Sequence, residues 1–285
     1  MSIWNDISWV EGIRTPFLNY FFYNISLTGY PIFLFLFLAF GYFFWSPQRF
    51  SRVAMLLFIS AVINSFLKDF FQDPRPPAEF MLDEGTGMSY GWPSGHAQIA
   101  VTLWGLLAYE LKNKFITLSA IVFISLVAFS RMYLGVHDLG DVFAGLIIGG
   151  FILLIWHYAI LYDVYKKFSS RSWFLIVLIF QLIAYWLYPT HEGHEISFWL
   201  LGAMAGWFLG ASNINISTNK ILKFLISALS TVAVFFTMIF LFQIEGSLEL
   251  IGFVSILYSY SLGLFFSIFV SWVIPRFWKI LRLAK

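Results

Sequence analysis

The sequence of 285 residues contains no cysteine and few charged side chains. The absence of cysteine excludes a disulfide scaffold. Charged residues make up only 11% of the chain, whereas a water-soluble domain carries about 25%, so an ordinary soluble enzyme and a disordered chain are both excluded. The formal net charge is +2, which gives no indication of a nucleic-acid partner. The composition is that of a protein dissolved in a lipid bilayer.

Hydrophobic residues make up 60% of the chain, and they gather in runs that approach the roughly 20 residues needed by a spanning helix. We therefore predict an all-α fold, a polytopic transmembrane helix bundle with nine spans. The approximate limits of these spans are residues 31–45, 53–67, 97–111, 115–129, 141–161, 173–187, 196–211, 221–242 and 250–274.

The first 28 residues differ from the predicted spans. Their apolar side chains recur at roughly helical spacing among charged ones and are interrupted by Pro16, which predicts helices that lie in the membrane interface. No secretory signal is evident, since a short basic start and a small-residue cleavage site are missing. We divide the chain into an interfacial amphipathic segment (1–28), a core of six spans (29–189) and a C-terminal membrane extension of three spans (190–285).

Lysine and arginine are distributed unevenly between the two faces that nine spans define. One face carries most of them, namely Arg49, Arg52, Lys112, Lys114, Lys166, Lys167, Arg171, Lys220, Lys223, Arg276, Lys279, Arg282 and Lys285. The opposite face carries Arg14, Lys68, Arg75 and Arg131. Because positive charge marks the cytoplasmic side, we expect a cytoplasmic C-terminus and an extracytoplasmic N-terminus.

Three cations of the outer face belong to a recognisable pattern, and charge at the mouth of a helix bundle is usually functional. Lys68 and Arg75 lie in FLKDFFQDPRPP, which is followed by YGWPSGHAQ and then, with Arg131, by FSRMYLGVHDLGDVFAG. Together and in this order, these segments resemble the three signatures of the type 2 phosphatidic acid phosphatase superfamily, membrane-bound branch. The resemblance covers about residues 7–188. It implies a six-helix phosphatase core, and the last three predicted spans are additional to this core.

The residues support a phosphate site independently of the resemblance. Lys68 and Arg131 end predicted spans, whereas His96 and His137 open others, so four helix ends meet on the outer face. Three cations with no acidic metal cluster among them suit a tetrahedral oxyanion. The stretch Ser94-Gly95-His96 begins a helix and can offer backbone N–H groups to the same anion.

His137 and Asp141 are four residues apart at the start of a predicted helix, so they share a face and the carboxylate can accept a ring N–H. Such an oriented histidine is suited to nucleophilic catalysis. The resemblance implies that His137 attacks phosphorus, that Asp141 orients it and that His96 protonates the leaving oxygen. It implies that the phosphate-binding residues are Lys68, Arg75, Ser94, Gly95 and Arg131. We expect neither a metal ion nor a cofactor.

Other polar residues receive plainer interpretations. Asp69, Asp73 and Asp138 flank the motif residues, and we predict that they tune the local field or form salt bridges across the loops. For these residues, a solvated loop carboxylate is favoured over a catalytic one. The segment 191–195, His-Glu-Gly-His-Glu, lacks the spacing of a helical zinc site and is predicted to be a solvated loop.

The loop 77–92 carries acidic but no basic residues, including Glu79, Asp83 and Glu84. We take this to indicate that the ligand is not a highly anionic head group. The glycines and large apolar side chains of the loop are compatible with a lid over a lipid and with an ordinary surface loop.

The predicted function is that of an integral membrane phosphatase that faces the extracytoplasmic side and hydrolyses the terminal phosphate of a lipid phosphate or lipid diphosphate. The predicted partners are this substrate in the outer leaflet and membrane lipids, with no nucleic acid. Three alternatives stay open: undecaprenyl-diphosphate recycling in the envelope, hydrolysis of a soluble ester such as a sugar phosphate, and a non-catalytic membrane module. Packing, dimerisation into a homo-oligomer and substrate access are the roles considered for the last three spans.

Overall fold

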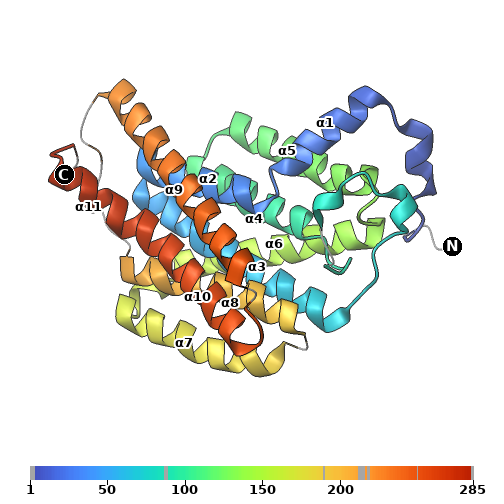
Figure 1. The fold of residues 1–285 in the computed structure, drawn as a ribbon. Coiled ribbons are helices and arrows are strands. Elements are labelled where there is room, and N and C mark those ends of the chain that lie inside the picture. The colour runs from blue at the N-terminus through green and yellow to red at the C-terminus, as the bar shows by residue number, and fades with distance from the viewer. Residues whose placement is uncertain are drawn as a thin grey trace. The chain divides into compact units, whose positions relative to one another are not determined.

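The computed structural model describes residues 4–86, 89–188, 190–210, 216, 219–248 and 250–283. These residues form a mainly helical structure (Figure 1). The α-helices are α1 (Pro16–Leu27), α2 (Pro31–Phe44), α3 (Pro47–Phe71), α4 (Gly95–Leu111), α5 (Lys114–Tyr133), α6 (Leu139–Leu161), α7 (Ser170–Leu187), α8 (His191–Gly210), α9 (Lys220–Leu248), α10 (Phe253–Ile268) and α11 (Ile274–Ile280). Short helices are η1 (Ser8–Ile13), η2 (Ala78–Phe80), η3 (Glu84–Thr86), η4 (Val164–Lys166) and the π-helical η5 (Phe269–Val273).

The chain divides into two compact units. The first comprises Met1–Leu34 and Ile59–Tyr162, and the second comprises Phe35–Phe58 and Asp163–Lys285. Helix α3 therefore contributes its residues to both units. These units do not follow the sequential segments 1–28, 29–189 and 190–285, which stay a prediction.

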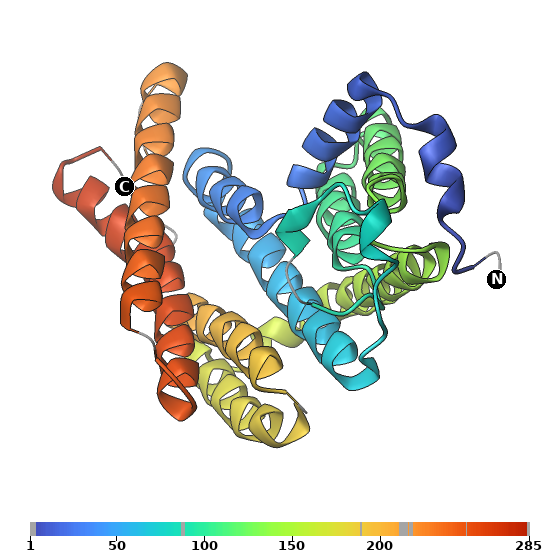
Figure 2. The ribbon, with the colours of Figure 1, turned by 45° about the vertical axis from the view of Figure 1, so that its right-hand side comes forward.

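In the first unit, α4 packs between α5 and α6 (Figure 2). The approach of α4 to α6 is close because glycines line the contact: a Cβ atom at Gly149 would lie 2.8 Å from the carbonyl oxygen of Gln98. A buried polar network joins α3 to α4. In it the Asn64 amide donates to Gln98 (3.0 Å), and the Gln98 amide donates to the Ser60 carbonyl (2.7 Å). These contacts fix the end of α3 beside the start of α4.

Helix starts in the first unit follow ordinary capping rules. Thr15 accepts a hydrogen bond from the Leu18 N–H (3.2 Å), and Pro16 occupies the first turn of α1, where a missing N–H costs nothing. The break predicted at Pro16 thus lies between η1, which ends at Ile13, and α1, which begins at Pro16. Asn113 caps α5 by accepting from two backbone N–H groups. Capping residues of this kind determine the residue at which each helix begins.

The second unit is built around α8 and α10. Their axes approach closely because small residues line the contact, as is usual between membrane helices: a Cβ atom at Gly206 would lie 3.0 Å from the Ser267 Cβ. Trp207 is buried against Tyr42, whose hydroxyl donates to the Ser271 carbonyl (3.2 Å). Trp278 donates from its indole N–H to Ser230 on α9 (2.8 Å).

The number of spans is lower than predicted. Six described helices are long and apolar enough to cross a membrane, and a seventh span results if α1 and α2, bent by 54°, count as one. Helix α4 has 17 residues, equivalent to about 25 Å, and carries the buried polar residues Gln98 and Thr102. Helix α2 has 14 residues, and the apolar part of α8 is Ile196–Gly210. The nine predicted spans are therefore not confirmed, although the protein is an integral multi-pass membrane protein.

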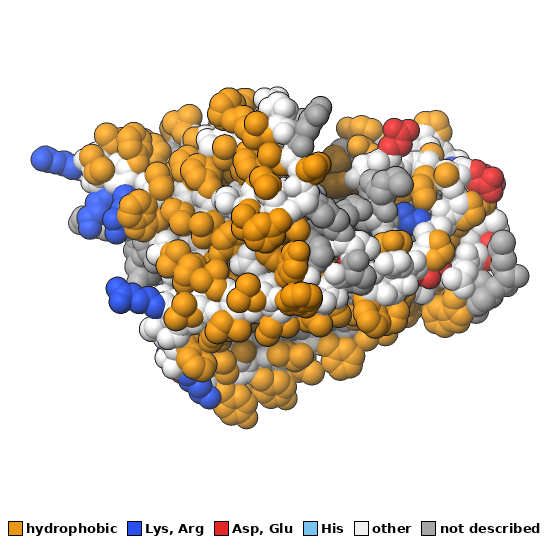
Figure 3. Space-filling view, turned by 60° about the horizontal axis from the view of Figure 1, so that its bottom comes forward, with side chains coloured by type: hydrophobic (Ala, Val, Ile, Leu, Met, Phe, Trp, Pro, Cys, Tyr) orange, Lys and Arg blue, Asp and Glu red, His pale blue; other side chains and the backbone are white. Residues whose placement is uncertain are grey.

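The helices expose many large apolar side chains, as expected of a protein surface that faces lipid. Figure 3 shows one face on which hydrophobic side chains predominate. On α6, Phe151 is 61% and Ile155 is 68% exposed, and on α7 Trp186 is 86% exposed. The segment 191–195, predicted to be a loop, instead forms the first turn of α8. Most of its side chains lie outside the described residues.

Candidate active site

The start of α6 presents a histidine and a carboxylate in contact. His137 Nδ1 lies 2.8 Å from Asp141 Oδ2, and both side chains are 2% exposed. The local sequence imposes this geometry through a capping box: Asp138 accepts from the Asp141 N–H (2.9 Å), and the Asp141 carboxylate accepts from the Asp138 N–H (3.3 Å). With an ionised Asp141, Nδ1 of His137 carries the proton and Nε2 keeps its lone pair.

Arg75 lies on the other side of the His137 ring. Its Nη1 is 3.4 Å from His137 Nε2 and donates to the Val136 carbonyl (2.8 Å). The same guanidinium holds Ser89 through Nε to the carbonyl (2.6 Å) and through Nη2 to the hydroxyl (2.8 Å). A tetrahedral anion placed next to Nε2 would therefore meet an arginine.

Lys68, in the last turn of α3, reaches the same region. Its Nζ donates to the carbonyls of Tyr90 and Gly91, the second at 2.9 Å. Gly91 in turn lies against α6, since a Cβ atom there would be 3.2 Å from Asp141 Oδ2. The ammonium group is thus held beside the loop segment that precedes α4.

The start of α4 supplies polar atoms without partners. The Ser94 N–H donates to the Asp141 carbonyl (3.0 Å) and thereby ties α4 to α6. Ser94 Oγ and His96 Nε2 are buried, and neither has a hydrogen-bond partner within the described part of the chain. Gly95 leaves no room for a side chain, because a Cβ atom would lie 2.8 Å from Asn64 Oδ1. Orphaned buried groups of this kind indicate a site for a polar ligand.

Arg131, near the end of α5, is fully buried. Its Nη1 donates to Asp83 Oδ2 (2.8 Å) and to the hydroxyl of Ser26. Neither partner belongs to the residues selected from the sequence, and both come from distant segments, so no local signal could have identified them.

The electrostatics of the loop residues follow from this convergence. Burial lowers the pKa of His137 well below its ordinary value of 6.5, and the charges of Lys68, Arg75 and Arg131 lower it further. The ring is therefore neutral at pH 7, as a nucleophile must be. Burial, followed by the charge of Arg131, lowers the pKa of Arg75 to about 10, so this guanidinium stays cationic at neutral pH.

The structure thus brings together, within the first unit, the eight residues selected from the sequence. It contradicts the predicted environment of two neighbouring carboxylates: Asp69 and Asp138 are buried, 4% and 8% exposed. Asp138 is a helix cap, and its second oxygen accepts from the Asn5 amide (2.9 Å). Asp73 has a pKa raised by partial burial and by the charge of Asp138.

No cluster of three or more histidine, cysteine, aspartate or glutamate side chains suitable for a metal ion occurs among the residues that the structure describes. The expectation of a metal-free site stays a prediction. The donors that converge on the site, Lys68, Arg75 and Arg131, are cationic and suit an anion.

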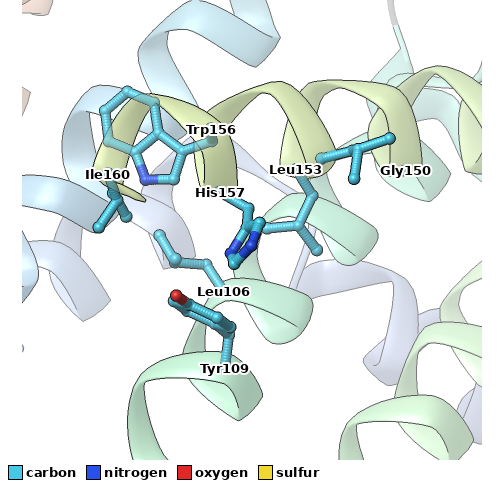
Figure 4. Close-up of a pocket in the computed structure, with 8 residues that line it drawn as sticks. Leu106, Tyr109, Gly150, Leu153, Trp156, His157 and Ile160 are labelled. Atoms are coloured by element: carbon cyan, nitrogen blue, oxygen red, sulfur yellow. The ribbon is translucent and has the colours of Figure 1, made fainter. Parts of the chain in front are cut away.

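A cavity of about 260 Å³ lies elsewhere, between α4 and α6 (Figure 4). It is lined mainly by apolar side chains, together with Tyr109, Trp156 and His157. His157 is 16 residues beyond Asp141 on α6, about 24 Å along the helix axis. The cavity is therefore separate from the candidate active site, and His157 lines the cavity.

Comparisons with known proteins relate the chain to one family. The model of the PAP2 superfamily matches residues 49–165. A lipid A 4'-phosphatase of Porphyromonas gingivalis is 30% identical over 175 residues, which are 57% of this chain and 72% of that protein. A dihydrosphingosine 1-phosphate phosphatase of Schizosaccharomyces pombe is 26% identical over 76% of this chain and 60% of its own length. Among solved structures, a PAP2-type phosphatidylglycerolphosphate phosphatase from Bacillus subtilis is 24% identical with a TM-score of 0.49, covering 57% of this chain and 84% of that one.

Proposed function

The chain belongs to the PAP2 superfamily and is a membrane phosphatase, and from this premise we propose that it hydrolyses the terminal phosphate of a lipid phosphate or lipid diphosphate through a phosphohistidine on His137. The observation that carries the proposal is the geometry of this ring. Nδ1 is held by Asp141 at 2.8 Å, and Nε2 faces Arg75 at 3.4 Å. The ring is thereby oriented and a binding group for the phosphoryl oxygens lies next to the nucleophilic atom.

The first half-reaction forms a nitrogen–phosphorus bond. The lone pair of His137 Nε2 attacks phosphorus, and the bond from phosphorus to the ester oxygen breaks. The departing oxygen takes a proton from His96. The negative charge of the bound phosphoryl group lies beside His96 and favours the imidazolium form that this donation requires.

The second half-reaction returns the enzyme to its starting state. Water attacks the phosphorus of the intermediate, His96 accepts one proton of this water, and the nitrogen–phosphorus bond breaks to release inorganic phosphate. Lys68, Arg75 and Arg131 neutralise the charge that spreads over the phosphoryl oxygens in both transition states. Ser94 Oγ and the N–H group of Gly95 supply neutral donors at the start of α4. Besides the substrate, this sequence of steps requires only water and groups of the protein.

A lipid substrate is favoured by the setting of the site. The catalytic groups lie at helix ends of a multi-pass membrane protein, where an amphiphile can present its phosphate while its chains stay in the bilayer. The relatives described above are named for lipid substrates. The C-terminal segment 190–285 would then serve packing, dimerisation or substrate access.

The substrate class is tested by phosphate release from purified protein in detergent with a chelator. The panel contains phosphatidate, lysophosphatidate, phosphatidylglycerophosphate, a sphingoid phosphate, undecaprenyl diphosphate and glucose 6-phosphate. We expect release from one or more lipids and none from the sugar phosphate. A preference for glucose 6-phosphate would indicate that the substrate is a soluble ester and not a lipid. Loss of activity in chelator would contradict the metal-free mechanism.

We propose that the active site faces the extracytoplasmic side, on the basis of the distribution of lysine and arginine. Because the chain lacks cysteine, single cysteines report their own accessibility. We expect Glu79→Cys, in the exposed η2 beside the site, to react with a membrane-impermeant maleimide in intact cells. Lys166→Cys, an exposed position of η4, should react only after permeabilisation. The opposite labelling pattern would place the site in the cytoplasm.

The pH dependence of kcat/KM should reflect the free enzyme. Because the pKa of His137 is lowered below 6.5, the neutral nucleophile persists on acidification, and we expect no loss of kcat/KM from pH 7 to about pH 6. Because the pKa of Arg75 is about 10, deprotonation should weaken phosphate binding and lower kcat/KM above that pH. An acidic decline centred at or above pH 6.5 that His96→Gln leaves in place would contradict a neutral His137.

A further inference from the structure

Asp83 is a buried carboxylate of the active-site region that lies outside the three family signatures. It comes from the loop between α3 and α4, and its side chain is 2% exposed. Oδ2 accepts from Arg131 Nη1 (2.8 Å), and Oδ1 accepts from the Tyr30 hydroxyl (2.6 Å) and the Gly85 N–H (3.1 Å). Asp83 is one of the acidic residues of the loop 77–92, and the structure shows that it is paired within the protein.

The two edges of the Arg131 guanidinium differ. Nη1 is used by Asp83 and by the hydroxyl of Ser26. Nε is buried and has no hydrogen-bond partner among the described residues. A guanidinium is a rigid planar fork, so a group bound at Nη1 fixes the direction of Nε. An unsatisfied buried N–H is costly, and an oxygen of a bound anion would satisfy it. Asp83 therefore holds Arg131 on the side away from this free donor.

Tyr30 connects this arginine to His96. Its hydroxyl binds Asp83, and its ring meets the His96 ring edge-on, with centroids 4.8 Å apart at 80°. Gly29 allows the close approach, because a Cβ atom there would collide with the His96 ring. The turn between α1 and α2 thus touches both His96 and the partners of Arg131.

We propose that Asp83 is a positioning residue of the active site, which aligns Arg131 for the phosphoryl group and, through Tyr30, couples this arginine to His96. The proposal rests on the proposed function. Asp83 then acts on Arg131 as Asp141 acts on His137. Each carboxylate binds one edge of a planar group, and the opposite edge of that group is directed at the substrate. In this arrangement the N-terminal segment contributes Ser26 and Tyr30 to the site.

The charge state of Asp83 supports this assignment. Burial by itself would raise the pKa of its carboxyl group, but hydrogen bonds from Tyr30 and the charge of Arg131 outweigh that effect and lower the pKa below its ordinary value. The carboxylate is therefore ionised at neutral pH. A buried ion pair of this kind orients the arginine but adds little to the free energy of folding, because desolvation of the two charges offsets most of their Coulomb attraction.

Asp83→Asn removes the charge while keeping the shape of the side chain. We expect the dissociation constant for inorganic phosphate, measured by titration calorimetry, to rise about 10- to 100-fold, as is typical when a hydrogen bond to a charged group is lost. KM for the lipid phosphate should rise in parallel. Glu84→Gln is the matched control, because it removes the same charge from the next residue of the loop, which is exposed; it should change neither constant by more than about twofold.

Action through Arg131 is tested by a double-mutant cycle. Once Arg131→Lys has removed the planar fork, Asp83 has no guanidinium to align, so adding Asp83→Asn should weaken phosphate binding by less than about threefold. Tyr30→Phe keeps the ring contact with His96 and removes only the hydroxyl. It should lower kcat/KM about 3- to 10-fold and provides a milder probe if Asp83→Asn does not fold, as judged by thermal unfolding.

Phosphate affinity of folded Asp83→Asn within about twofold of the unmodified protein would overturn the proposal, as would fully additive losses in the double variant. If Asp83→Asn does not fold, an unchanged kcat/KM in Tyr30→Phe would overturn it. Failure of the proposed function looks different. In that case the unmodified protein releases no phosphate from any lipid, whereas calorimetry with inorganic phosphate still decides whether Asp83 positions Arg131.

Discussion

His137→Ala should abolish phosphate release, with a fall in kcat of more than about 1,000-fold, because the variant lacks the atom that attacks phosphorus. The same variant should also fail to form a covalent phosphoenzyme intermediate that can be trapped. When the unmodified protein is quenched during turnover of a substrate labelled with radioactive phosphorus, we expect a labelled protein whose label is lost in acid, as is characteristic of phosphohistidine. His137→Ala should carry no label.

A second histidine of α6 provides the matched control. His157 lies in the apolar cavity, where the centroid of its ring is 5.2 Å from that of Tyr109, and it is far from the candidate active site. His157→Ala should leave kcat and the labelled intermediate intact. An acid-stable label, or activity of His137→Ala within about tenfold of the unmodified protein, would rule out His137 as the covalent nucleophile.

Asp141→Asn should lower kcat about 100- to 10,000-fold with little change in phosphate affinity. The carboxylate holds His137 Nδ1 at 2.8 Å, and a neutral amide can donate to this nitrogen, which would select the wrong tautomer and stop the attack by Nε2. The magnitude is that seen when the orienting carboxylate of another oriented histidine is replaced by an amide. The measurement is steady-state kinetics together with calorimetry of inorganic phosphate.

Asp138→Asn separates this effect from the structure of the helix start. Asp138 shares the capping box with Asp141, and its second carboxylate oxygen accepts from the Asn5 amide. Asparagine caps helices as well as aspartate does. We expect kcat of Asp138→Asn to stay within about tenfold of the unmodified protein. Equal losses in Asp138→Asn and Asp141→Asn would show that the carboxylates act by holding the helix start, and not by orienting the histidine.

The residues of the site could largely be selected from the sequence because local spacing carries the necessary information. His137 and Asp141 meet because residues four apart share a helix face, and Asp138 starts that helix at the required position. The Ser94-Gly95-His96 stretch begins α4 as expected. Their catalytic roles stay predictions until the variants are measured.

The span count was less predictable, because hydropathy does not distinguish a helix that crosses the membrane from a buried one that merely packs in the bundle. Helix α4 illustrates this: it is short, and its polar Gln98 and Thr102 are buried by neighbouring helices. Helices α1 and α2 illustrate a second limit, since they are bent by 54° at their junction, and a hydropathy profile contains no information about such a bend.

The sequence by itself determined a membrane-embedded helical protein, its family signatures and the candidate site residues, because composition and short-range spacing are local properties. Only the tertiary structure decided what holds those groups. Asp83 reaches Arg131 across 48 residues and Ser26 reaches it across 105. Such pairings join helix α1 and the loop between α3 and α4 to helix α5. Burial, which no single position in a sequence encodes, strengthens these contacts.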